Sequence, residues 1–279
     1  MSVRAFFREN PAALVGAVLA LVLAVVAIVG PQVTSADPNA IDVTSRFRGP
    51  SAIHPLGTDD LGRDTLARIV YGSRTSLVIA FLATLMGTLG GHAIGLLSGF
   101  VGGWLDALIM RIDDLFFAIP TLLVAIGIVA LFGASAQTTI LALGIAYIPF
   151  YARLVRGAVV GVRSRMYVDA SRVVGSSGLR LISTDIMPGV TPVALVQSTA
   201  LLGYALVDEA SLGFLGLGVQ PPDASWGAMI NAGRQFVFQA PWLTVIPGVA
   251  VIVAVFAINL VGDGLRDALD PRLAQRAGG

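Results

Sequence analysis

The sequence predicts an all-α integral membrane protein with six transmembrane helices, and three observations support this fold class. Apolar residues make up 56% of the 279 residues. Only 13% of the residues carry charge, about half the share that is usual in a soluble globular domain. The charged residues also leave long gaps, and a helix needs about 20 mostly apolar residues to cross the roughly 30 Å hydrocarbon core of a bilayer. Because the gaps show no strand-like alternation, helices rather than barrel strands are expected.

The charge-free gaps place the helices. Four gaps suit one helix each, whereas the gap between Asp114 and Arg153 is too long for one. Its middle, Leu131–Thr139, contains small and polar residues that suit a tight turn between two helices. The predicted spans lie near 11–30, 75–99, 115–132, 138–155, 190–210 and 243–262.

The first span has a second interpretation as a secretory signal, because Arg4 and Arg8 precede its apolar run. The run Ala12–Val29 is 18 residues long, whereas the apolar core of a signal peptide has about 7–15 residues. An uncleaved first helix is therefore the preferred interpretation.

The distribution of arginine predicts the orientation. All 18 basic residues are Arg, of which 12 lie in one set of connecting segments and 6 in the other. Cytoplasmic loops carry the excess of basic residues, so both termini and the Arg-rich segment 153–188 are expected in the cytoplasm. We expect three parts: 1–72, with the first helix and an outer segment of short helices or a small cap; the transmembrane domain 73–264; and a cytoplasmic tail, 265–279.

Several classes of function are excluded by composition. The net charge of +1 argues against a surface that binds nucleic acid. The chain has no Cys, which removes disulfides, thiolate metal sites and cysteine nucleophiles. It also has no Lys, which removes the lysine of a P-loop, so we expect no ATP hydrolysis, catalytic residue, metal site or cofactor in this chain. His54 has no second His nearby to form a metal site.

A row of glycines marks the second span. The glycines recur every four residues and therefore share one face of a helix, which allows another helix to approach closely: Gly87, Gly91, Gly95, Gly99 and Gly103. Helix packing is the preferred interpretation, and a pore-lining role is the alternative. His92 lies on the same helix, where an ionisable side chain suggests proton coupling or, alternatively, a neutral hydrogen-bonded imidazole.

Two pairs of acidic residues flank predicted spans. Asp113 and Asp114 precede the third span, where they are expected to cap the N-terminus of its helix. Asp208 and Glu209 lie near the outer end of the fifth span. The Gly- and Pro-rich stretch Ser211–Pro222 follows and should bend back over the bundle. Together with Phe214 these residues form a candidate outer gate. The alternative is a pair of carboxylates in interfacial water.

The longest cytoplasmic loop has a pattern that a simple connector does not need. Asp169 can cap a short helix whose first turn contains Ala170 and Ser171, and Gly175 then ends or turns it. An amphipathic segment, Leu179–Ile186, leads to Pro188 at the start of the next span. The small residues and the turn would form a compact knob that fits a groove on another protein.

This loop resembles the EAA motif of ABC-importer permeases, E-A-A-x(3)-G-x(9)-I-x-L-P. Asp169, Ala170 and Ser171 stand at E-A-A, Gly175 at the glycine, and Met187-Pro188 at the final L-P, while Asp185 replaces the apolar position. Three further stretches look like the C-type permease of the dipeptide/oligopeptide/nickel importers: His54–Leu77, Gly99–Pro120 and Asp208–Ile230.

The resemblance implies a type I ABC importer permease in a bacterial cytoplasmic membrane. It implies a heterodimer with a second permease, two ATPase subunits that bind ATP and Mg²⁺ and receive the coupling loop at about 163–188, and an extracytoplasmic substrate-binding protein. Di- or oligopeptides are the first substrate implied; nickel, glutathione and other small solutes are alternatives.

Two other classes have less support in the residues. A self-contained secondary transporter would need ionisable groups near the bilayer midplane, and only His92 qualifies. An intramembrane hydrolase would need a serine motif beside a His, or two intramembrane Asp, and neither pattern is present.

Overall fold

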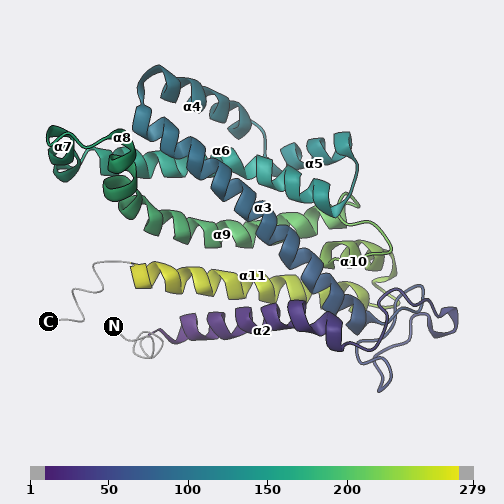
Figure 1. The fold of residues 1–279 in the computed structure, drawn as a ribbon. Coiled ribbons are helices and arrows are strands. Elements are labelled where there is room, and N and C mark those ends of the chain that lie inside the picture. Colours follow the sequence, from purple (N-terminus) through teal and green to yellow (C-terminus); the bar gives the residue numbers. More distant parts are fainter. Residues whose placement is uncertain (1–9, 270–279) are drawn as a thin grey trace.

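The computed structural model describes residues 10–269, and these residues fold almost entirely into helices (Figure 1). Two 3₁₀-helices, η1 (Val43–Ser45) and η3 (Arg234–Phe236), accompany them. In chain order the other helices are α2 (Pro11–Val33), α3 (Thr65–Val101), α4 (Gly103–Phe117), α5 (Thr121–Phe132), α6 (Ala136–Arg163), α7 (Met166–Val173), α8 (Gly178–Arg180), the π-helix η2 (Leu181–Ile186), α9 (Met187–Phe214), α10 (Trp226–Gly233) and α11 (Trp242–Leu269).

Five helical segments within residues 10–269 are long and apolar enough to cross a bilayer: α2, α3, α6, α11 and the continuous run Gly178–Phe214. The pair α4 and α5 passes the same test together but is bent by 84° at a short break, so it adds a sixth candidate crossing if the bent pair is one span. In Figure 1, α3 and α6 both run from right to left, and α4 and α5 return the chain from left to right. The structure thus contains five of the predicted crossings as continuous helices and the other as a broken helix pair.

The third span differs from its prediction as one helix over 115–132. The helix α5 has 12 residues, which extend only about 18 Å at 1.5 Å per residue. Pro120, which has no backbone N–H to continue the ladder, follows the end of α4 and precedes α5. A gap in charge locates apolar residues correctly but does not reveal this break.

The largest helix interface joins α3 to α6 and is built on the glycine row. A Cβ atom on Gly87 or Gly91 would lie 2.6 Å from the Cβ atom of Tyr147 or Tyr151, and one on Gly99 would lie 2.8 Å from that of Val159. Gly95 meets α6 in the same way, and all four glycines are buried. The row is thus a packing face and does not line an open pore.

Gly103 does not belong to this packing face. The helix α3 ends at Val101, and Gly103 begins α4 with a φ of +63°. A Cβ atom placed on Gly103 would meet nothing within 4 Å. The prediction for Gly103 was wrong because the four-residue period has meaning only while the helix continues.

Two of the three acidic residues of α4 pair with arginines of α6. Asp114 accepts a hydrogen bond from Arg153 at 2.6 Å, and both carboxylate oxygens of Asp106 pair with Arg156 at 2.5 and 2.6 Å. Asp113 is buried in the last turns of α4. The prediction that Asp113 and Asp114 cap a helix N-terminus was therefore wrong, because the chain breaks after them and not before them.

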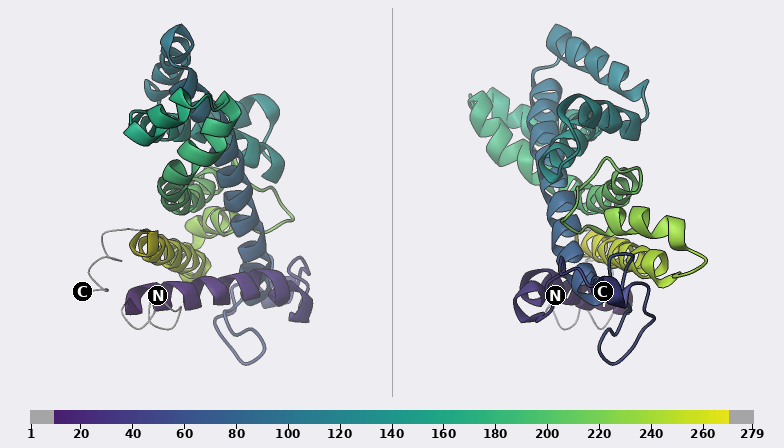
Figure 2. Two further views of the ribbon diagram at one scale, coloured as in Figure 1. Left: turned by 60° about the vertical axis from the view of Figure 1, so that its left-hand side comes forward. Right: turned by 90° about the vertical axis from the view of Figure 1, so that its right-hand side faces the viewer.

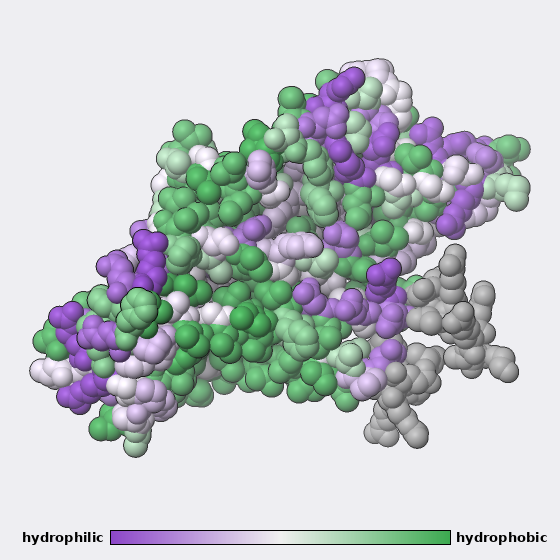
Figure 3. Space-filling view, turned by 180° about the vertical axis from the view of Figure 1, so that it is seen from behind, coloured by the Kyte–Doolittle hydropathy of each residue, from purple (hydrophilic) through white to green (hydrophobic). Residues whose placement is uncertain are grey.

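The first and last spans pack side by side, as Figures 1 and 2 show for α2 and α11. Gly16 of α2 lies against Leu260, and Gly264 of α11 lies against Ala13, so small residues again bring the two backbones close. Seen from behind, apolar residues cover most of the middle of the bundle, and hydrophilic residues gather mainly toward its two ends (Figure 3). This distribution is that of a bundle surrounded by lipid.

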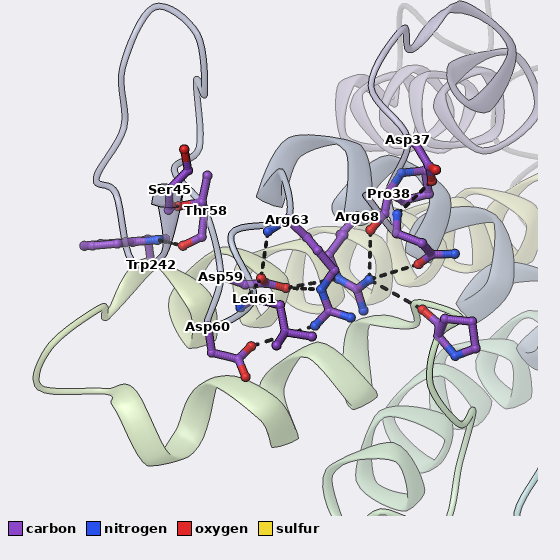
Figure 4. Close-up of polar contacts among 12 residues, drawn as sticks. Asp37, Pro38, Ser45, Thr58, Asp59, Asp60, Leu61, Arg63, Arg68 and Trp242 are labelled. Atoms are coloured by element: carbon purple, nitrogen blue, oxygen red, sulfur yellow. Dashed lines mark hydrogen bonds and ion pairs between the residues drawn. The ribbon is translucent and has the colours of Figure 1, made fainter. Parts of the chain in front are cut away.

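Residues 34–64 form the predicted cap, which polar contacts fasten to the bundle (Figure 4). Arg68 of α3 donates to the carbonyl oxygens of Pro38 at 3.0 Å and of Pro222 at 3.5 Å. The indole of Trp242 donates to the carbonyl oxygen of Thr58 at 3.3 Å. These bonds join the cap to α3, to α11 and to the loop before α10.

Two carboxylates organise the turns of the cap. Hydrogen bonds from Ser45 and Thr44 lower the pKa of Asp42 to about 2, so Asp42 stays ionised and caps η1. Asp64 accepts a hydrogen bond from the backbone N–H of Ala67 and caps α3. The cap thus positions the start of the longest helix in the bundle.

Candidate functional site

The helix α7 forms a projection at one end of the bundle, which we call the knob and define as residues 166–186. Figure 1 shows α7 beyond the ends of the spanning helices. Within α7, Val168 is fully buried, and the hydroxyl of Tyr167 donates a hydrogen bond to the carbonyl oxygen of Asp185 at 3.3 Å. Within the knob, Leu181 and Ile186 are also buried in the core, whereas α7 itself is attached by few contacts.

The outer surface of the knob is apolar although it projects from the bundle. The exposed fractions of Met166, Val173 and Val174 are 89%, 88% and 85%, and Leu179 is exposed beside them. A group of apolar side chains that project from a polar end of the molecule is typical of a protein–protein interface. Sequence reasoning named the small residues here and missed these four, which only their exposure identifies.

The residues of the EAA-like motif lie on this knob. Asp169 is exposed in the first turn of α7 and pairs with Arg172 at 3.2 Å. Ala170 and Ser171 follow it on the same helix, and Gly175 turns the chain after the helix with a φ of +86°. Asp169 is not the N-cap that its position suggested, because α7 already begins at Met166. Its carboxylate still lies near the positive end of the helix dipole.

The knob continues into the next span without interruption. The segments α8, η2 and α9 form one helical run from Gly178 to Phe214, and Pro188 is the second residue of α9. Pro188 has no backbone N–H to donate, and the π-helical turn η2 directly before it marks where the hydrogen-bond pattern of the run changes. The knob and α9 are thus joined by continuous helix from Gly178 onward.

The opposite end of α9 holds the two acidic residues of the candidate gate. Asp208 accepts a hydrogen bond from the hydroxyl of Tyr147 at 2.7 Å. Glu209 is 1% exposed, and the hydroxyls of Ser76 and Ser225 face its carboxyl group without closing a hydrogen bond of ordinary geometry. Glu209 therefore does not lie in interfacial water, whereas Phe214 is partly exposed beneath the guanidinium of Arg234.

The Gly- and Pro-rich stretch after α9 bends back as predicted. A Cβ atom on Gly227 would lie 2.6 Å from the carbonyl oxygen of Ala210, and one on Gly213 would lie 2.8 Å from the backbone of Gly227. The backbone N–H of Trp226 donates to the hydroxyl of Ser76 at 3.0 Å. The helix α10 is consequently held tightly between α9 and α3.

The two histidines have ordinary partners. His92 is half-buried, and its Nε2 atom lies 3.3 Å from the sulfur of Met187. The Nδ1 atom of His54 lies 2.8 Å from a carboxylate oxygen of Asp64. Among residues 10–269, no three His, Asp or Glu side chains are grouped to hold a metal ion.

Comparisons with known proteins agree with this geometry. Residues 91–275 match the family described as "Binding-protein-dependent transport system inner membrane component", and residues 2–50 match the "N-terminal TM domain of oligopeptide transport permease C".

Three curated relatives align over nearly the whole chain. The dipeptide transport system permease protein DppC of Alkalihalophilus pseudofirmus is 41% identical over 95% of this chain and 88% of its own. The protein of the same name from Haemophilus influenzae is 40% identical over 97% and 94%. The glutathione transport system permease protein GsiD of Pectobacterium atrosepticum is 38% identical over 97% and 90%.

Solved structures share the fold. A chain of the MetNI methionine ABC transporter in an inward-facing conformation superposes with a TM-score of 0.61 at 20% identity, over 73% of this chain and 96% of that one. A chain of an amino acid ABC transporter gives a TM-score of 0.58 at 16% identity, over 72% and 94%. The chain is a multi-pass inner membrane protein with the type I ABC importer permease fold, and it belongs to the family of binding-protein-dependent transport system inner membrane components.

Proposed function

We propose that this chain forms, with a second permease, the pathway through which an ATP-driven importer moves di- or oligopeptides. The observation that carries the importer mechanism is the knob, whose apolar outer surface is uncovered and whose base continues into α9. The peptide substrate is supported by the relatives that are 40–41% identical and are named as dipeptide permeases. Glutathione, itself a small peptide, is the second candidate because one relative is named for it.

The proposed partners follow from the absence of a nucleotide-binding motif in this chain and from its exposed knob. The second permease makes a heterodimer, and two ATPase subunits supply ATP and Mg²⁺ binding, since this chain has no Lys for a P-loop. An extracytoplasmic binding protein delivers the peptide, and lipid surrounds the apolar middle of the bundle. Neither nucleic acid nor a cofactor of its own is part of this proposal.

The coupling residues act through their position. Asp169, Ala170 and Ser171 leave little bulk on α7, so a groove of the ATPase subunit reaches the apolar residues around them. Gly175 sets the turn, and Pro188 lies where the knob continues into α9. Closure of the ATPases then rocks the knob and α9 as one body, which alternates the exposure of the pathway.

The proposed orientation, with the knob in the cytoplasm, has support from the structure and from the charges. The start of α2 and the end of α11 lie at the same end of the bundle as the knob (Figure 1). Arg163, Arg165, Arg172 and Arg180 gather at this end as well, as the distribution of basic residues in cytoplasmic loops requires. The division into 1–72, 73–264 and 265–279, and an outer gate formed by Asp208, Glu209 and Phe214, belong to the same proposal.

The test is transport by the reconstituted complex. Proteoliposomes that contain both permeases, both ATPases and the binding protein are loaded with ATP, and uptake of radiolabelled dialanine is measured. Uptake should require ATP and the binding protein and should persist with a protonophore. Uptake by the permeases alone along an ion gradient would contradict the proposal and favour a secondary transporter.

A further inference from the structure

One face of α9 is largely uncovered by the rest of the described chain, apart from the guanidinium of Arg234 over Phe214 at its end. Its residues recur at helical spacing and share one side of the helix: Val193, Gln197, Tyr204, Val207, Ser211 and Phe214. Tyr204 is 62% exposed, and Val193 and Val207 are also exposed. Elsewhere α9 packs against α3, α6, α10 and α11, although Leu195 near its start is also exposed. We call this the open face of α9.

Two polar side chains on the open face have no partner. Within residues 10–269, neither the amide of Gln197 nor the hydroxyl of Tyr204 forms a hydrogen bond. Both residues lie well inside a membrane-spanning helix. An unpaired amide or hydroxyl in hydrocarbon is unfavourable, because it loses its bonds to water and gains none. The open face therefore does not suit contact with lipid tails.

The open face also differs from the tight helix interfaces of this bundle. Those interfaces use small residues, such as the α3 glycine row against α6 and Gly262 of α11 against Thr199 of α9. The open face instead projects Tyr204, Val193 and Phe214, which would hold another helix at a distance. Close association of membrane helices is enriched in small residues. A water-containing space is the environment that suits this face.

We propose that Gln197 and Tyr204 line the translocation pathway and form transient hydrogen bonds with the backbone of the passing peptide; this rests on the proposed peptide import. An amide and a phenol each donate and accept, as a peptide bond does, and they do so whatever side chains the peptide carries. Both are neutral, so they bind weakly enough to release the substrate, as conduction requires.

The geometry of α9 supports the same role. Gln197 and Tyr204 are seven residues apart, which is about 10 Å along a helix at 1.5 Å per residue. Three residues of an extended peptide cover a similar length, at about 3.3 Å each. Because α9 continues directly from the knob, movement of the knob would shift both side chains relative to the peptide.

The first experiment measures whether water reaches these positions. The chain contains no Cys, so Gln197→Cys and Tyr204→Cys each introduce a single thiol into this subunit. The complete complex in proteoliposomes is treated with a charged, membrane-impermeant methanethiosulfonate, and labelling of this chain is measured with and without ATP. Leu21→Cys, on the exposed apolar side of α2, is the lipid-facing control.

Labelling at 197 and 204 should be at least tenfold faster than at 21 in one of the two states, and added trialanine with the binding protein should slow it. Labelling as slow as at residue 21 in both states would overturn the inference, because the open face would then be covered by lipid or by a helix.

The second experiment measures transport with variants of nearly unchanged shape. The double variant Gln197→Leu, Tyr204→Phe should keep the ATP hydrolysis that the loaded binding protein stimulates, while trialanine uptake per ATP falls at least fivefold. Thr88→Val removes a hydroxyl from α3, where it bonds only its own helix, and should leave the ratio unchanged. An unchanged ratio in the double variant would overturn the inference. Failure of the wild-type complex to import any peptide would instead refute the proposed function.

Discussion

The two ends of α9 are held in opposite ways. Before the start of α9, the helix α7 of the knob is held by the burial of Val168 and a side-chain hydrogen bond from Tyr167, and the outer surface of the knob is apolar and exposed. At the far end, Gly213 and Gly227 bring two backbones into contact, and Ser76 bonds the N-terminus of α10. One continuous helical run, Gly178–Phe214, thus connects the exposed apolar surface of the knob with the tightly packed junction of α9, α10 and α3.

Because of this difference, substitutions at the two ends of α9 should have different effects. At the knob, changes should spare assembly and damage the transmission of movement, because few contacts of the bundle depend on it. At the junction of α9, α10 and α3, changes should damage the fold itself, because displaced backbone has nowhere to go.

The largest effect is expected from Gly175→Trp at the knob. Gly175 has a φ of +86°, which an L-residue adopts at a cost of about 1–2 kcal/mol. A Cβ atom there meets nothing within 4 Å, so the strain falls on the turn and not on the bundle. We expect an assembled complex in which uptake of dialanine falls more than tenfold.

The control for this variant is Gly157→Ala on α6, where a Cβ atom also meets nothing within 4 Å and φ is helical. Its uptake should match the wild type. Normal uptake and normal substrate-stimulated ATP hydrolysis in Gly175→Trp would refute docking through the knob.

Gly227→Ala should show the contrasting behaviour at the junction. The added Cβ atom would lie 2.6 Å from the carbonyl oxygen of Ala210, and backbone must shift to admit it. Overpacking of this kind costs about 1–3 kcal/mol. The solubilised complex should aggregate at a lower temperature, measured by size-exclusion chromatography after heating. An aggregation midpoint temperature equal to that of Gly157→Ala would show that the junction can admit the added Cβ atom without strain.

Val174→Ser tests the apolar surface of the knob. Burial of a Val side chain against a partner contributes about 1.5 kcal/mol, which corresponds to roughly tenfold in affinity. Binding of the purified ATPase subunits to permeases in nanodiscs should therefore weaken about tenfold. Ile41→Ser removes an exposed apolar side chain at the cap and should not change this affinity. Equal weakening by both variants would mean that the knob is not the docking surface.

Asp64→Ala and Asp169→Ala compare two acidic residues near helix N-termini. Asp64 caps α3 through the N–H of Ala67, and loss of such a cap costs about 1 kcal/mol. Asp169 only pairs with Arg172 three residues on, a contact worth about 0.2–0.5 kcal/mol. The loss of thermal stability should accordingly be larger for Asp64→Ala. The reverse order would contradict the weak attachment of the knob.

The sequence predicted what depends on composition and short-range spacing. Charge-free gaps located the five continuous crossings and the apolar part of the broken pair, and the four-residue period from Gly87 to Gly99 identified a face that the structure buries. It did not reveal the break before Pro120, since the residues next to the break are apolar on both sides, from Leu115 to Ile119 and from Leu122 to Phe132. The sequence likewise did not show that Gly103 lies outside the glycine row of α3.

Features that depend on which elements meet could not be obtained in this way. Asp106 and Asp114 pair with arginines of α6 that look like free loop charges in the sequence. The burial of Glu209 follows from the return of α10, and adjacent Asp208 gives no sign that the two differ. The open face of α9 is defined by the absence of neighbours, which only the packed bundle shows.

The smallest effect is expected from His92→Phe, which tests whether α3 contributes an ionisable group to the mechanism. His92 packs against Met187 at the junction of the knob with α9, and its ring nitrogen has a sulfur rather than a carboxylate beside it. A ring in that position can be replaced by another ring of similar size, so uptake of dialanine should persist within about twofold, as volume-conserving changes usually permit. The dependence of uptake on pH between 5 and 8 should also be unchanged, because that range covers the titration of an ordinary His. Loss of a pH-dependent step in the variant would show that protons take part in transport. A comparison of the loosely attached knob with the tightly packed junction would then leave out a contribution from α3.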